Sequence, residues 1–118
     1  FDVVFAANLL HHSDLPEKIV AEAVRVSRRH VVLLEPNRVN PLMLVFSLLV
    51  RAERGGLRSS TGFLTRLLRQ QGCRVTRCAA MGMISENYTP SMLVPFLRAF
   101  DREFFWGEYV VAIGDKGR

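Results

Sequence analysis

The chain has 118 residues, enough for one domain at most, and 49% of them are hydrophobic, which excludes a disordered chain. Its formal net charge is +5, and its only cysteines, Cys73 and Cys78, are too few for a disulfide framework or a cysteine-based metal cage. The longest apolar run, 42–50, is shorter than the roughly 20 residues that cross a bilayer, and no signal peptide pattern opens the chain. These features predict a cytoplasmic globular domain without a transmembrane segment or a metal site.

The first predicted element is a strand at Val3–Ala7, an apolar run without polar alternation. Such a run is typical of a strand buried on both faces of a parallel sheet. Asp14 and Glu17 have the spacing of a capping box and predict a helix over 15–27. Ligands of open α/β sheets bind beyond the carboxyl ends of the strands, so we expect the polar residues of 8–12 to lie beside a ligand.

The remaining elements are predicted in the same way, from apolar runs, helix-capping residues, and prolines or glycines that end an element. A second buried strand is predicted over 30–35 and ends at Pro36, because proline donates no ladder hydrogen bond. Asn40-Pro41 predicts the start of an almost entirely apolar helix, 41–53, which Gly55 would close. The later predictions are a helix over 62–71 capped by Ser59 or Ser60, a strand over 73–79, a loop over 81–88, a helical segment from Thr89 interrupted at Pro95, and a strand over 108–114.

Two stretches of the first third, FDVVFAANLLHHSDLPEKIVAEAVRV and HVVLLEPN, resemble the middle of class I S-adenosylmethionine-dependent methyltransferases of the type 11 kind. In that family a Phe-Asp-aliphatic strand is followed by a Leu-His-His-like turn, a helix ending in Glu-x-x-Arg-Val, and a strand ending in Glu-Pro. The matching residues here are 1–7, Leu10-His11-His12, Glu22-x-x-Arg25-Val26 and 31–36. The rest of the chain matches by element order.

The resemblance implies the second half of a doubly wound, Rossmann-like α/β sheet, mostly parallel, with an antiparallel last strand between the second and third strands. It implies S-adenosylmethionine as the cofactor. In the family a glycine-rich cofactor loop and a ribose-binding acid precede the first strand seen here, and this sequence contains neither. We therefore expect a partial methyltransferase domain over 1–118, the carboxyl-terminal half of a longer enzyme, that does not bind the cofactor tightly by itself.

The resemblance also places Ala7, Asn8, Leu9 and His11 near the methionine part of the cofactor. The alternative for Asn8 is that it only satisfies the strand end. His12 is the candidate catalytic base, since imidazole titrates near neutral pH. Adjacent histidines point in different directions, so we expect at most one of them to face the site; the alternative is a histidine bonded to the loop backbone.

Five residues are predicted to contact the methyl acceptor: Glu35, Asn37, Arg38, Phe46 and Tyr88. The alternative for Glu35 is a strand-end carboxylate that binds loop amides. The apolar helix 41–53 suggests either a wall over a small or lipid-like acceptor or an ordinary buried helix.

A second class of function is a non-catalytic binding module with a basic face for nucleic acid or a protein partner. Arginines concentrate over 51–77, where Glu53 is the only acid. No aromatic interleaving and no helix-turn-helix pattern accompany them, so a nucleic-acid partner is disfavoured. The first strand, if it lies at a sheet edge, is expected to promote self-association.

Overall fold

The computed structural model describes residues 1–82, 90–100, 102–103 and 106–117. Four strands, β1 (Val3–Ala7), β2 (His30–Pro36), β3 (Arg74–Met81) and β4 (Tyr109–Asp115), form one sheet in the order β1-β2-β4-β3. The pairing of β1 with β2 is parallel, and β4 is antiparallel to both β2 and β3. The predicted α/β sheet with an antiparallel last strand between the second and third strands is therefore confirmed.

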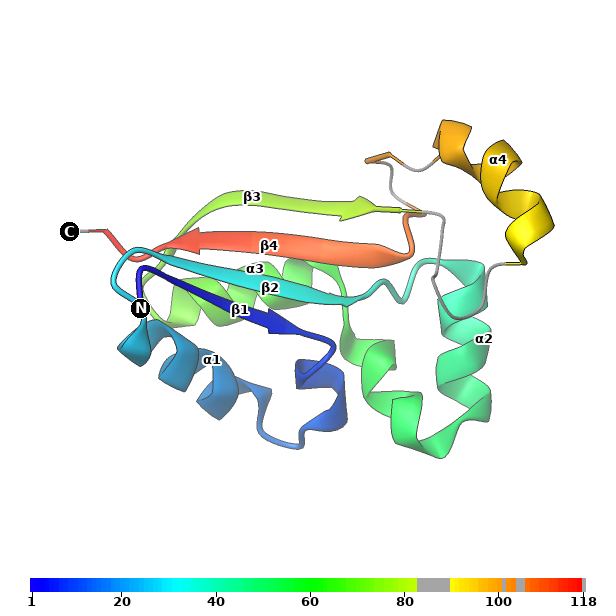
Figure 1. The fold of residues 1–118 in the computed structure, drawn as a ribbon. Coiled ribbons are helices and arrows are strands. Elements are labelled where there is room, and N and C mark those ends of the chain that lie inside the picture. The colour runs from blue at the N-terminus through cyan, green and yellow to red at the C-terminus, as the bar shows by residue number, and fades with distance from the viewer. Residues whose placement is uncertain (83–89, 101, 104–105, 118) are drawn as a thin grey trace.

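Two helices, α1 (Pro16–Val26) and α3 (Thr61–Gln70), cover the same face of this sheet (Figure 1). Each helix buries an apolar stripe at helical spacing against the strands. Leu64, Leu67 and Leu68 of α3 are all at most 1% exposed. On the strands, alternate residues such as Val31 and Leu33 point into the same core and are fully buried.

The opposite face of β1 is open to solvent among the described residues. Val3 is 52% exposed and Phe5 is 61% exposed. The expectation that this strand is buried on both faces is therefore wrong for the described part of the chain. The reason is the arrangement of the layers: α1 and α3 lie on one face only (Figure 1), and a strand with one covered face buries only alternate residues.

The start of α1 also differs from the prediction. Pro16 occupies the first helical turn, Leu15 stands at the N-cap position, and no side chain caps the helix. Asp14 therefore falls one residue too early to cap the free amides, and the predicted capping box does not form. Instead, the Ser13 hydroxyl accepts a hydrogen bond from the Leu15 amide at 3.1 Å.

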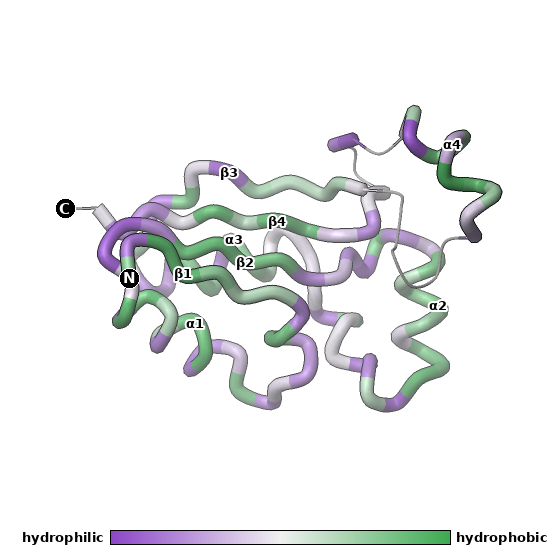
Figure 2. Tube along the Cα trace, in the orientation of Figure 1, coloured by the Kyte–Doolittle hydropathy of each residue, from purple (hydrophilic) through white to green (hydrophobic). Residues whose placement is uncertain are grey.

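The helix α2 (Pro41–Leu49) begins as predicted, because the Asn40 carboxamide oxygen accepts from the Leu42 and Met43 amides at 3.0 and 3.1 Å. It ends four residues earlier than predicted and continues into a 3-10 helix, η2 (Arg51–Arg58). Only Met43 and Ser47 of α2 are buried, so α2 is not an ordinary buried helix. Figure 2 shows that this helix of mostly hydrophobic residues lies at the end of the molecule beyond β1 and β2.

The boundaries of α3, β3 and β4 lie within two residues of the predicted ones, whereas residues 83–89 of the predicted loop and the predicted helix start at Thr89 lie outside the described residues. The Ser60 hydroxyl caps α3 by accepting from the Phe63 amide at 3.1 Å, and Gly72 follows the helix with φ of 76°. Near Pro95 the chain forms η3 (Ser91–Leu93), α4 (Val94–Leu97) and η4 (Arg98–Phe100), which confirms the predicted interruption. Within the described residues, no helix has the length and apolarity that crossing a bilayer demands.

Candidate functional site

A cavity of about 230 Å³ lies beyond the carboxyl ends of β1 and β2. Its walls come from the ends of both strands, from a 3-10 turn η1 (Leu10–His12), from α2 and η2, and from the start of β4. The lining residues are Asn8, His11, His12, Pro36, Met43, Phe46, Ser47, Glu53, Glu108 and Tyr109. This is the edge at which the sequence predicts a ligand.

Glu35 does not line the cavity but contacts His11, which does. It follows Val31 and Leu33 on the helix-covered face of β2 and is completely buried. One carboxylate oxygen, Oε1, accepts from the backbone amides of Leu9 and Leu10 at 2.9 and 2.7 Å. A buried carboxylate is tolerated only where such donors satisfy it, so Glu35 anchors the loop after β1.

His11 lies between two carboxylates. Its Nδ1 is 2.6 Å from Oε2 of Glu35, and its Nε2 is 3.0 Å from Oε2 of Glu53. Burial opposes the charged form of the ring, but the hydrogen bonds and negative charges of Glu35 and Glu53 outweigh it and raise the pKa of His11 above 6.5. When the ring is protonated, Nδ1 donates to Glu35 and Nε2 donates to Glu53.

His12 lies beside His11 with 3.9 Å between the two ring centroids. Its Nδ1 lies 3.1 Å from the carbonyl oxygen of Ala52, and its Nε2 lies 3.6 Å from Oε1 of Glu53. Both histidines line the cavity, so the expectation that at most one faces the site is wrong. The physical reason is the tight 3-10 turn, which carries both rings toward η2.

The residues predicted to contact the cofactor divide between two hollows. Asn8, held at φ of 52°, lines the cavity together with His11. Asparagine is one of the few residues that adopt this backbone conformation readily. Ala7 and Leu9 instead line an open groove of about 650 Å³ between β1 and α1.

The residues predicted to contact the acceptor are also separated. Phe46 lines the cavity, whereas Glu35 is fully buried and does not line it. The Asn37 side chain donates to the Gly107 carbonyl at 2.8 Å, and Arg38 is exposed; neither is among the cavity-lining residues. Tyr88 lies outside the described residues.

Glu53 is the site residue that the sequence analysis did not single out as functional. It is the only acid within the arginine-rich stretch 51–77, and that isolation was the available signal. Glu53 reaches His11 only because η2 packs against η1. The two residues are 42 positions apart in the sequence.

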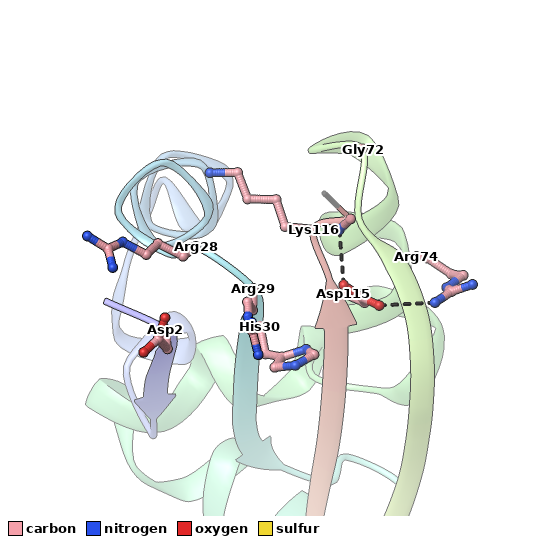
Figure 3. Close-up of a pocket in the computed structure, with 9 residues that line it drawn as sticks. Asp2, Arg28, Arg29, His30, Gly72, Arg74, Asp115 and Lys116 are labelled. Atoms are coloured by element: carbon pink, nitrogen blue, oxygen red, sulfur yellow. Dashed lines mark hydrogen bonds and ion pairs between the residues drawn. The ribbon is translucent and has the colours of Figure 1, made fainter.

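A larger open hollow of about 920 Å³ lies at the opposite end of the sheet and contains several cationic residues. Arg74 and Lys116 already have partners within the protein. Figure 3 shows Arg74 directed to Asp115 on one side and Lys116 extended toward the end of α1. The Lys116 ammonium donates to the carbonyls of Val24 and Ser27 at 2.8 and 2.9 Å. It therefore caps the carboxyl end of α1 and is not available to bind an anion.

The fold is that of the class I S-adenosylmethionine-dependent methyltransferases. A methyltransferase from Thermotoga maritima, described as a possible histamine N-methyltransferase, superposes with a TM-score of 0.74 at 17% identity, over 99% of this chain and 56% of that one. A methyltransferase from Archaeoglobus fulgidus gives 0.64 at 14% identity, over 98% and 59% of the two chains.

Magnesium protoporphyrin IX methyltransferase from Synechocystis, solved with bound S-adenosylhomocysteine, gives a TM-score of 0.56 at 13% identity, over 99% of this chain and 45% of that one. The chain thus spans about half the length of these structures. No protein-family model and no curated protein matches the sequence. At these identities the likeness establishes the fold, and the activity has to be argued from the site.

Proposed function

We propose that this chain forms the acceptor side of a methyltransferase that uses S-adenosylmethionine and methylates a small-molecule or lipid-like acceptor, as part of a longer enzyme. The observation that carries the proposal is the cavity beyond the carboxyl ends of β1 and β2, on a methyltransferase fold. In open α/β sheets this edge is where ligands bind.

The cavity lining combines two kinds of side chain. Histidine and glutamate side chains contribute polar groups, and Met43 and Phe46 of α2 contribute apolar surface. Beyond the cavity, α2 presents Leu42, Leu48 and Leu49 to solvent, all more than 50% exposed. This combination suits an acceptor with a polar reacting group and an apolar body.

S-adenosylmethionine would supply a methyl group on a sulfonium sulfur, and its transfer to an acceptor lone pair breaks the carbon–sulfur bond and leaves S-adenosylhomocysteine. The described residues fit such a ligand at the strand end, where Ala7, Asn8 and Leu9 are exposed. We assign the methionine part of the cofactor to that segment. His11 is already bonded on both ring nitrogens, so we assign it to holding the turn and Glu53 in place.

Where the acceptor carries a proton, that proton has to leave as the new bond forms. His12 is the base that we propose, because it lines the cavity and its side chain is 45% exposed. Such a base contributes about 10²–10⁴-fold to a rate.

The test uses the complete reading frame that contains Phe1. We expect a strand followed by a glycine-rich turn upstream, and transfer of labelled methyl from S-adenosylmethionine into a panel of phenols, amines and prenylated acceptors. His12→Gln should lower kcat by about 10²-fold or more, while His30→Gln at the opposite end of the sheet should leave it unchanged. Tight cofactor binding by the 118-residue chain alone would refute the assignment to a partial domain. Absence of cofactor binding by the complete protein would refute methyl transfer.

A further inference from the structure

We propose that His11, His12 and Glu53 form a binding site for a divalent transition-metal ion of the zinc type in the wall of the cavity. One ligand atom from each residue lies within 4.8 Å of the other two. The inference stands on this side-chain geometry and does not rest on the proposed methyl transfer.

The first argument is the way His11 is held. Metal-binding histidines almost always donate the proton of their second ring nitrogen to a carboxylate or carbonyl, which fixes the ring and its tautomer. Nδ1 of His11 lies 2.6 Å from a Glu35 carboxylate that is itself fixed by two backbone amides. This support directs Nε2 toward Glu53.

The second argument is that His12 is held in the same way. Its Nδ1 faces the Ala52 carbonyl oxygen at 3.1 Å, so the proton belongs on Nδ1 and the lone pair on Nε2. This Nε2 lies 3.6 Å from Oε1 of Glu53, so in neutral His12 both atoms can donate a lone pair to an ion placed between them. Each of the two adjacent histidines is held at Nδ1 by its own partner, and both Nε2 atoms lie near the Glu53 carboxylate. This arrangement distinguishes the site from a cluster of charged side chains on the surface.

The third argument is distance. Zinc–nitrogen and zinc–oxygen bonds of about 2.0–2.2 Å in tetrahedral geometry place ligand atoms roughly 3.3–3.5 Å apart. The Nε2 atoms of His11 and His12 lie 3.0 and 3.6 Å from oxygens of Glu53, close to that spacing.

The donor set indicates the class of ion. Two imidazoles and one carboxylate suit zinc, cobalt or nickel, whereas magnesium and calcium prefer all-oxygen sites. Three protein ligands leave a fourth tetrahedral position, which would face the cavity. A polar group of a molecule bound there would complete the coordination and be polarised by the ion.

Ion binding would release the proton on Nε2 of His11 to solvent, because a ligating imidazole nitrogen needs its lone pair. It would also use the lone pair on Nε2 of His12, so His12 would not act as a free base while the ion is bound. His12 can therefore either bind the ion or act as a base, but it cannot do both at once.

The experiment is a titration of the complete 118-residue chain, purified without a histidine tag, with cobalt(II) followed by displacement with zinc. We expect one ion per chain, visible absorption typical of nitrogen and oxygen ligands, and a higher melting temperature with zinc. His12→Gln and Glu53→Gln, chosen because these side chains are partly exposed, should each weaken binding by at least about 10-fold, by comparison with the 10–100-fold effect of supporting residues. Circular dichroism has to show that both variants keep the secondary structure.

His30→Gln is the matched control, because His30 is the only other histidine of the chain and lines the opposite end of the sheet. It should bind the ion like the original chain. Absence of stoichiometric binding to the original chain, an equal loss in His30→Gln, or a thiolate-to-cobalt absorption band from the cysteines would each overturn the proposal. None of these readouts needs a cofactor or a methyl acceptor, so a negative result is distinct from failure of the proposed function.

Discussion

Gly55 shows how much of the site depends on a single missing side chain. A Cβ atom at this position would lie 1.6 Å from the His11 carbonyl oxygen, so η2 approaches η1 at a distance that only glycine allows. The predicted role of Gly55, closing the preceding helix, is wrong, because it lies inside η2. Its position instead brings Glu53 to the two histidines.

We predict that Gly55→Ala displaces η2 and destabilises the chain by about 1–3 kcal/mol, the usual range for overpacking. Gly62→Ala is the matched control, since its Cβ would meet only the Ser60 hydroxyl at 4.0 Å in the first turn of α3. That control should change stability by about 1 kcal/mol at most, in the stabilising direction, because alanine favours helix. Denaturant unfolding of both variants measures the difference, and equal effects would contradict the close approach.

The two cysteines differ in environment. Burial raises the pKa of the Cys73 thiol above 9.0; Asp115 adds to this shift and Lys116 opposes it. Cys78 is only partly buried, on β3. Since the thiolate is the reactive form, Cys73 at mildly alkaline pH should hold little of it.

We predict that iodoacetamide modifies Cys78 well before Cys73 in the folded chain, and that both react at similar rates in denaturant. Mass spectrometry of peptides from a time course measures the order. Faster modification of Cys73 in the folded chain would show that its environment is open or electropositive.

At the scale of elements, α2 has two unequal sides. Met43 is 9% exposed and faces inward, whereas Leu49 is 78% exposed. The outward leucines do not line the cavity, and together they form an exposed apolar surface next to it. We propose that the apolar body of an acceptor extends over this surface.

We predict that Met43→Ala costs about 2 kcal/mol or more of unfolding free energy, as buried methionine truncations do. Leu49→Gln should change it by less than about 0.5 kcal/mol, the range for exposed positions. Thermal melts of both variants decide this, and a large loss in Leu49→Gln would mean that the outward side of α2 is packed. If the acceptor is lipid-like, Leu49→Gln should weaken its binding without this loss of stability.

At the scale of the whole molecule, the sheet has an open edge and an open face on the same strand. Among the described strands β1 pairs only with β2, and its outer face exposes Val3 and Phe5. Unpaired edges with apolar side chains tend to pair with other chains. The superposed methyltransferases are about twice as long as this chain.

We predict that the isolated 118-residue chain self-associates through β1, with a sedimentation coefficient that rises with concentration. Phe5→Lys should reduce the association, because a charge on an edge strand opposes pairing. Leu49→Gln serves as the control for a general gain in solubility. A monomeric mass at every concentration, together with a sharp melt, would show that the edge is harmless and that the chain folds by itself.

The sequence by itself determined the elements and much of their order in the sheet. Apolar runs predicted β1 and β2, Asn40 and either Ser59 or Ser60 predicted two helix starts, and Pro95 predicted the late interruption. These features were predictable because periodicity, capping and proline geometry act over a few neighbouring residues. The position of β4, antiparallel between β2 and β3, was predicted only from the resemblance to methyltransferases, because local sequence patterns do not indicate which strands pair.

Only the tertiary structure decided how the site is assembled. The contact between Glu53 and His11 spans 42 residues, and that between Glu35 and His11 spans 24. Both depend on the path of η1 and η2 through space and on the close approach at Gly55. Such contacts arise when packing brings loops together, and no local pattern of residues specifies that meeting. The open face of β1 was not predictable for the same reason. An apolar run indicates that a strand can be buried on both faces, but it does not indicate which elements cover those faces.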